Sequence, residues 1–188
     1  MTLIDLGTGS AVEPASLADI KSYCRIDRDD EDGLILRLAR AARLAIEAET
    51  GLSLVRRAFR LCLDPAPRGG WLTLPRRPLD AVLAVTAYDA GGTPVVFGAE
   101  TGIDARMPGG QAVRLAPAVL RAAANGVEVE FRAGWLPDAV PADIFLALLQ
   151  TVALSYEARG MVEPDAQPAA FPGSASRLLA PFRHTRLT

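Results

Sequence analysis

Residues Val140–Gly160 read VPADIFLALLQTVALSYEARG. Pro141 suits the first position of a helix, because its missing amide hydrogen would have no partner there. Gly160 is a typical helix terminator. Apolar residues recur at helical spacing along one stripe, and others, including Leu146 and Leu154, extend that stripe almost around the helix. The pattern predicts a long helix that is buried on most sides. Two earlier helices could cover one face, and either a sheet or a neighbouring subunit could cover another.

Two shorter helical patterns lie near the start of the chain. Ser16 can cap a first helix, with Asp19 in the position of a capping box. A second helix is predicted from about Glu31 to Thr50, where apolar and alanine residues repeat at helical spacing before Gly51.

Three arginines of this second helix lie between its apolar positions. They are Arg37, Arg40 and Arg43. Two interpretations are open: a face in contact with solvent or a neighbouring subunit, which we favour, and a nucleic-acid site.

Between these helical segments the sequence alternates with a period of two residues. Phe59–Leu63 and Ala81–Tyr88 have strand patterns, and Asn125-Gly126 forms a turn before the regular alternation of Val127–Arg132. Alternation of this kind predicts antiparallel strands with one packed face and one solvated face.

The order of these patterns predicts an α+β fold. Residues 16–52 and 135–160 are expected to form a small helical bundle, from two N-terminal helices and a long C-terminal helix. Residues 53–134 are expected to form an antiparallel β insertion between them. Residues 1–15 are predicted to be an N-terminal arm without a core of its own, and residues 161–188 a linker and a flexible C-terminal docking tail.

Composition narrows the possible functions. The net charge of −2 at pH 7 gives no indication of non-specific binding to nucleic acid or to an anionic membrane. No apolar run reaches the length of about 20 residues that a membrane span needs, and no signal peptide is evident, so we expect a soluble intracellular protein. Cys24 and Cys62 lack partners at metal-ligand spacing and are expected to be buried hydrophobic residues.

The sequence lacks the constellations that catalysis requires. His184 is the only histidine and lies in the predicted tail, where a general base would be poorly positioned. The acidic run Asp27–Asp32 lacks the ligand spacing of a calcium loop and fits the acid-rich start of a helix better. We therefore expect no enzyme activity, no catalytic residues, no metal site and no cofactor.

Several short motifs occur together in a defined order. They are Leu17–Lys21 with Asp29-Asp30; Ala41-Ala42, Ala45–Glu47 and Thr50-Gly51; Leu74–Leu79 before the strand to Tyr88-Asp89; Phe131–Trp135 before Val140-Pro141; Tyr156-Glu157 with Arg159; and Leu178–Arg183. In order and spacing the chain resembles the head-tail connector (adaptor or head-completion) proteins of tailed bacteriophages and of phage-derived gene transfer agents.

This resemblance implies a structural protein of the virion neck, assembled in the host cytoplasm. It implies a ring of about 12 copies that joins the portal protein to a tail-side connector, either a stopper or a tail terminator. DNA would pass through the channel without sequence-specific binding, and no membrane would be involved. Ring contacts are expected from the exposed faces of the helices, at Arg37, Arg40, Arg43, Leu146 and Leu154.

The C-terminal segment carries arginines and large apolar residues but no acid, so it is either a frayed terminus or a tail that orders on a partner. With the resemblance, the portal is the expected partner. The residues expected to bind it are Phe171, Arg177, Leu178, Leu179, Phe182, Arg183, Arg186 and Leu187.

An alternative function is sequence-tolerant binding of nucleic acid. It would use the arginine-rich second helix and its surroundings and would show a steep dependence of DNA affinity on salt. The residues concerned are Arg37, Arg40, Arg43, Arg56 and Arg57.

Overall fold

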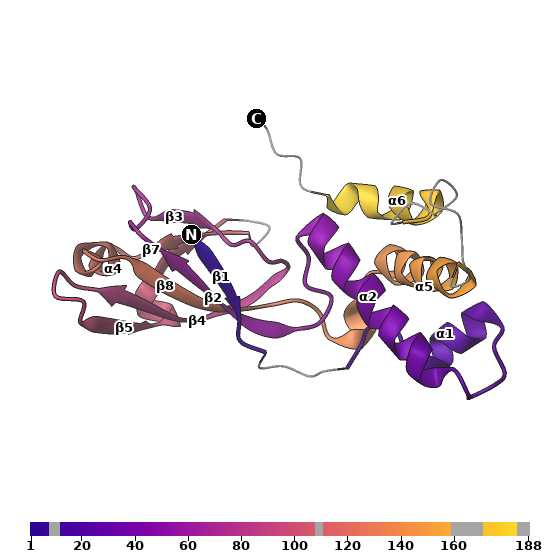
Figure 1. Ribbon diagram of the computed structural model, residues 1–188. Coiled ribbons are helices and arrows are strands. Elements are labelled where there is room, and N and C mark those ends of the chain that lie inside the picture. The colour runs from indigo at the N-terminus through magenta and orange to yellow at the C-terminus, as the bar shows by residue number, and fades with distance from the viewer. Residues whose placement is uncertain (8–11, 108–110, 159–170, 184–188) are drawn as a thin grey trace. The chain divides into compact units, whose positions relative to one another are not determined.

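The computed structural model describes residues 1–7, 12–107, 111–158 and 171–183 (Figure 1). The chain forms two compact units. We call Met1–Ser10 with Val55–Gly134 the β unit, and Ala11–Leu54 with Trp135–Thr188 the helical unit. Antiparallel sheets in one unit and packed helices in the other confirm the predicted α+β class.

The helical unit is built around one central helix. Its described elements are α1 (Leu17–Cys24), α2 (Asp32–Thr50), η1 (Pro137–Ala139), α5 (Ala142–Glu157), α6 (Gly173–Leu179) and η3 (Ala180–Phe182). Helix α5 contacts α1, α2 and α6, as the right-hand part of Figure 1 shows. Ile144, Leu148 and Val152 point from α5 into the core, where they meet Ile35 and Ile46 of α2. The apolar surface that extends around α5 is thus largely covered within its own unit.

Local signals in the sequence fix the ends of the first two helices. The Asp19 amide donates to Ser16 Oγ (3.1 Å), and the Ser16 amide donates to Asp19 Oδ2 (2.9 Å), so the predicted capping box is present. Gly51 ends α2 in a left-handed conformation (φ 71°) and donates its amide hydrogen to Glu47 O (3.0 Å).

Acid should weaken the start of α1. The hydrogen bonds from Ser16 hold the pKa of the Asp19 carboxyl group below its usual range. A carboxyl group whose pKa is lower in the folded state stabilises the fold at pH values above its pKa in the unfolded state. This stabilisation is lost as the pH falls through the pKa of the folded state. Asp19→Asn should therefore reduce the free energy of unfolding at pH 7 and make a smaller difference near pH 2. Urea titrations at both pH values measure this, with the loop variant Asp27→Asn as control; equal effects at the two pH values would contradict it.

The β unit contains two antiparallel sheets. A five-stranded sheet has the order β1-β2-β8-β4-β5, and a three-stranded sheet has the order β3-β7-β6. The elements are β1 (Thr2–Asp5), β2 (Arg57–Leu63), β3 (Trp71–Thr73), β4 (Leu79–Tyr88), β5 (Pro94–Gly98), α3 (Ala99–Gly102), β6 (Ile103–Arg106), β7 (Ala112–Leu115), α4 (Pro117–Ala122) and β8 (Val127–Ala133).

Strand β8 lies at the centre of the larger sheet, and its alternation separates the two faces. Phe131 pairs with Phe59 of β2, and their rings stack 5.6 Å apart in the core. On the opposite face the neighbouring pair is ionic, with Arg60 Nη2 2.6 Å from Glu130 Oε1. This is the packed and solvated arrangement that the alternation predicts.

The N-terminus differs from the prediction of an arm for residues 1–15. Thr2–Asp5 form the edge strand β1 and pair with β2 in the register Leu3↔Leu61. The Leu6 amide donates to Ala58 O (3.0 Å), and Asp5 forms an ion pair with Arg57 (2.8 Å). The partner strand lies more than 50 residues away in the sequence, so no local pattern near the N-terminus indicates the pairing.

The C-terminal segment also differs from the prediction of a flexible tail. Residues Gly173–Leu179 form α6, which packs on α5, and η3 follows directly. The predicted linker up to residue 170 and the last five residues lie outside the described residues. Of the apolar residues that suggested binding to a partner, Leu179 is buried in the chain's own core, and Phe171, Leu178 and Phe182 pack against it.

Candidate interaction surfaces

The inner side of α6 belongs to the core of the helical unit. Leu179 is fully buried, and Phe171, Leu178 and Phe182 are partly buried against the same cluster. This conformation therefore does not present these four predicted portal anchors as a free apolar surface. Leu179 in particular is a core residue here, because α5 offers it an apolar surface within the same chain.

The outer side of α6 carries positive charge. Arg177 is exposed in its last turn. Arg183 is also exposed, but its Nε lies 2.9 Å from Glu49 Oε1 on α2, and its Nη2 donates to Ser176 Oγ (3.3 Å). Arg186 and Leu187 lie outside the described residues. Arg177 is thus the member of the predicted portal set that the described structure presents most freely.

Arg43 is a core residue, contrary to its expected role in contacts between subunits. Its Nε is 2.7 Å from Glu13 Oε2, and its Nη1 is 3.2 Å from Glu47 Oε2. Glu47 Oε1 also accepts the Leu54 amide hydrogen (2.8 Å). Burial alone would lower the pKa of Arg43, but the bond to Glu13 and the charges of Glu47 and Glu13 raise it above its ordinary value. The Arg43 guanidinium therefore forms its ion pairs within the subunit.

The remaining residues of the predicted subunit contact are more accessible. Arg37 and Arg40 are exposed on α2, Leu146 of α5 is 38% exposed, and Leu154 is half-buried. Leu36 and Leu44 accompany the two arginines, each 46% exposed. We call the exposed side of this helix the α2 outer face; its residues are Gly33, Leu36, Arg37, Arg40, Ala41, Leu44 and Ala48.

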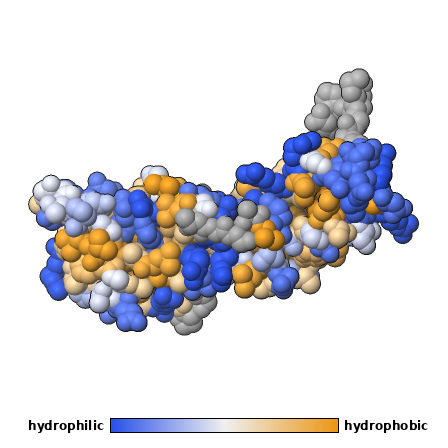
Figure 2. Space-filling model, turned by 90° about the horizontal axis from the view of Figure 1, so that it is seen from below, coloured by the Kyte–Doolittle hydropathy of each residue, from blue (hydrophilic) through white to orange (hydrophobic). Residues whose placement is uncertain are grey.

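The acidic run between α1 and α2 forms a corner that ion pairs hold in place. Lys21 forms ion pairs with Asp29 and, at 2.9 Å, with Asp32. Arg28 Nη2 donates to the Tyr156 hydroxyl (3.2 Å), which ties the loop to α5. Figure 2 shows strongly hydrophilic side chains over the end of the helical unit that carries α1. No group of three or more potential ligands is arranged for a metal ion among the described residues.

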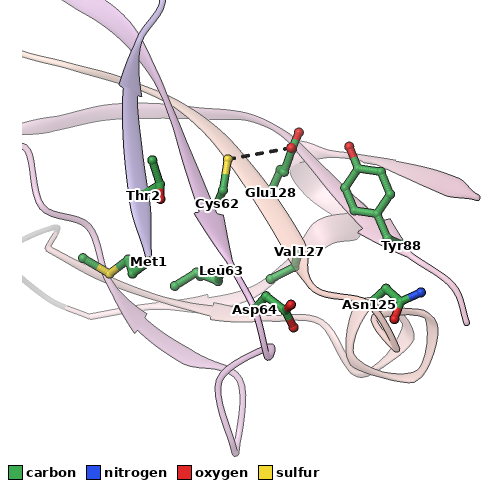
Figure 3. A pocket seen from close by; sticks show the side chains of 9 residues that line it. All are labelled: Met1, Thr2, Cys62, Leu63, Asp64, Tyr88, Asn125, Val127 and Glu128. Carbon is green, nitrogen blue, oxygen red and sulfur yellow. Dashed lines mark hydrogen bonds between the residues drawn. The ribbon is translucent and has the colours of Figure 1, made fainter. Parts of the chain in front are cut away.

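A polar pocket lies in the β unit (Figure 3). Cys62 Sγ donates to Glu128 Oε1 (3.7 Å), and Tyr88 lies on the other side of this carboxylate. Burial, with the nearby Glu128, raises the pKa of both the Cys62 thiol and the Tyr88 hydroxyl. A nucleophilic cysteine requires a lowered pKa, so the arrangement does not activate this thiol.

Comparison with known proteins points to one class. Residues 14–90 match the family model described as phage gp6-like head-tail connector protein. A chain in the neck of an empty gene transfer agent (GTA) particle, computed with C6 symmetry, aligns at 27% identity and a TM-score of 0.79. A chain in the neck of a native GTA particle, computed with C12 symmetry, aligns at 29% identity and a TM-score of 0.72. Each alignment covers 100% of this chain and 98% of the other.

The chain resembles phage-type head-tail connector proteins, in sequence over residues 14–90 and in fold along its whole length. A chain from the virion of a native GTA particle gives a similar match, at 27% identity and a TM-score of 0.78. No curated protein sequence matches this chain significantly. The matched family and structures are structural components of particle necks, rather than enzymes. In the described parts of the chain, no helix has the length and apolar character to cross a membrane.

The five arginines of the nucleic-acid hypothesis do not form one set in this chain. Arg43 is buried between carboxylates. Arg57 pairs with Asp5 (2.8 Å) and lies over the Phe59 ring, 5.4 Å from its centroid. On α2 only Arg37 and Arg40 remain exposed.

Sequence reasoning missed two features of the helical unit: an exposed pair of leucines on α2 and the carboxylates that surround the buried Arg43. The exposed leucines Leu36 and Leu44 flank Arg40 at intervals of four residues, a spacing that places all three on one side of a helix. The carboxylates around Arg43 come from Glu13 and Glu47. Glu47 is one helical turn from Arg43 and could have been found from its spacing; Glu13 lies in a segment without a regular pattern.

Proposed function

We propose that this connector is a structural head-tail adaptor that forms an oligomeric ring in the neck of a phage-like particle. The ring would join the portal protein to a tail-side connector, a stopper or a tail terminator, and would line the channel through which DNA passes. The observation that carries the proposal is the match along the whole chain to proteins from GTA necks. The cyclic symmetry of those necks supports a ring, and assembly would take place in the host cytoplasm.

The charge of the connector suits a channel wall. Each phosphate that a cation neutralises adds salt-dependent affinity, and strong binding would slow the passage of DNA. A net charge of −2, with Arg43 and Arg57 held in ion pairs inside the subunit, limits that affinity. We therefore expect only weak binding to duplex DNA, without sequence preference.

The C-terminal segment is the proposed contact with the portal. Because Leu179 and its apolar neighbours hold α6 on α5, we propose that this segment docks as a folded helix. Arg177 would face the portal, and Arg183 with the final residues Arg186 and Leu187 would extend the contact. Acidic residues on the portal would complement these arginines.

Electron microscopy of the connector mixed with its portal tests the proposed function. We expect a second ring of density stacked on the portal, with the same rotational symmetry axis. Portal particles that remain bare at saturating connector concentration would contradict the adaptor function.

Charge reversal on α6 tests the proposed portal contact. Arg177→Glu should weaken binding to the portal about tenfold or more, because it places like charges together at the contact. Surface plasmon resonance on immobilised portal measures the affinity. Arg121→Glu makes the same change in charge at an exposed site on α4 and serves as the control. Equal affinities of the two variants would exclude Arg177 from the contact. These variants are preferable to truncation at residue 171, which would also open the core.

A further inference from the structure

The α2 outer face has the composition of a contact surface. Leu36 and Leu44 are each 46% exposed, and Arg40 lies between them, one helical turn from each. Gly33, Ala41 and Ala48 lie on the same side, and small residues of this kind permit close approach of a partner. A face that only contacts solvent has no need of two leucines flanking an arginine.

The arginines of this face have no acidic partner within the described chain. Within the described residues, the side chains of Arg37 and Arg40 form no ion pair and no hydrogen bond, whereas Arg43 on the buried side has two carboxylates. The exposed pair therefore leaves positive charge for a partner to neutralise.

Two copies of this face do not complement each other. If two α2 helices paired across a two-fold axis centred on this face, Arg40 would lie against Arg40. Like charges placed together at an interface are strongly unfavourable. The face therefore requires a different, acidic surface.

The connector carries such a surface elsewhere on the helical unit. Residues 27–32 read DRDDED, the densest acidic run in the sequence. Asp27, Asp29 and Asp30 are exposed in the loop before α2, and we call these three residues the acidic corner. Lys21 and Arg28 offset part of their charge, but the side chains of Asp29 and Asp30 remain 86% and 69% exposed.

We infer that the α2 outer face of one connector subunit binds the acidic corner of the next subunit. Arg37 and Arg40 would pair with the aspartates, while Leu36 and Leu44 would be buried at the contact. Because the two surfaces differ, each subunit contacts one neighbour through its α2 outer face and the other neighbour through its acidic corner. Head-to-tail contacts of this kind can close into a ring. The inference rests on the ring assembly proposed above and assigns surfaces to it. The leucines favour protein over DNA as the partner of this face, because phosphate contacts need no apolar flanks.

Charge reversal in both surfaces tests the pairing. We expect the double variant Arg37→Glu/Arg40→Glu, and separately Asp27→Arg/Asp30→Arg, to weaken association between copies about tenfold or more. An equimolar mixture of the two variants should recover association. If the variants alternate around the ring, the reversed α2 outer face of one meets the reversed acidic corner of the other, and the unchanged surfaces meet at the next contact. Sedimentation velocity over a concentration series, and ring occupancy on the portal by electron microscopy, measure the effect.

Disulfide trapping tests the geometry independently. In a Cys24→Ala/Cys62→Ala background, Ala41→Cys combined with Asp27→Cys should form a ladder of covalent multimers under mild oxidation on the portal. Ala41→Cys alone should form no ladder. Dimers from Ala41→Cys alone would show a two-fold contact and overturn the inference.

The outcomes separate the inference from the proposed function. Rings on the portal that survive both charge reversals, or that a mixture of the variants does not restore, would overturn the surface assignment and leave the adaptor function standing. Absence of wild-type rings on the portal would overturn both. If Arg37→Glu/Arg40→Glu instead abolished a salt-sensitive retardation of duplex DNA and left association unchanged, the α2 outer face would be a DNA surface.

Discussion

Replacing Leu179 with alanine should lower the free energy of unfolding of the helical unit by about 2–5 kcal/mol. Leu179 is fully buried at the contact of α6 with α5, so truncation removes apolar burial and leaves a cavity. The loss should release α6 before the rest of the unit unfolds, because this short helix depends on its packing.

Tryptophan fluorescence can follow this unit by itself. Trp135 packs against the core of the helical unit, while Trp71 belongs to the β unit, so a Trp71→Phe background leaves Trp135 as the reporter. Urea titration then gives the free energy of unfolding. Leu146→Ala on α5, where the side chain is 38% exposed, is the control and should cost about 1 kcal/mol or less. A Leu179→Ala effect no larger than the control would show that α6 is not held on α5 in solution.

Replacing Glu47 with alanine should cost about 3–5 kcal/mol, because it breaks a buried ion pair and leaves part of the Arg43 charge without a partner. Glu47 is 2% exposed, and it also accepts the Leu54 amide hydrogen (2.8 Å), which would lose its acceptor. The same Trp135 titration measures the loss.

Two further variants distinguish the buried pair from ordinary surface charge. Glu49 lies on α2, like Glu47, but it is exposed and forms an ion pair with Arg183. Glu49→Ala should therefore lower the free energy of unfolding by less than about 1 kcal/mol. Arg43→Met/Glu47→Leu removes both buried charges and should be less destabilising than Glu47→Ala alone. If Glu47→Ala and Glu49→Ala had equal effects, the Arg43 site would be solvated rather than buried.

The parts of the fold that local patterns determine could be predicted from the sequence. Helix α5 combines a proline start with apolar residues on most sides, and the structure buries Ile144 and Leu148 as expected. The alternation of β8 likewise predicts its packed and solvated faces. In α5 and β8 the spacing of apolar residues and the backbone hydrogen bonding both favour the same secondary structure, so the local sequence determines the element.

The parts that depend on distant partners could not be predicted. Nothing near Thr2–Asp5 indicates pairing with β2, and the composition of the segment around α6 suits an external partner as well as its own α5. Arg43 has the same spacing as Arg37 and Arg40, but only the approach of Glu13 from another segment places it inside. The difference between exposed and buried arginines matters for a candidate interaction surface. Exposed arginines can bind a partner, whereas a buried arginine already has its ion-pair partners within the chain.

The buried cluster around Arg43 has a mechanical consequence. Glu13 lies on the segment that enters the helical unit, and Leu54 lies where the chain leaves it for β2. Both segments are fastened to the same two turns of α2 through Arg43 and Glu47. Tension on either connection would therefore be transmitted to the C-terminal half of α2, where Arg43 and Glu47 lie.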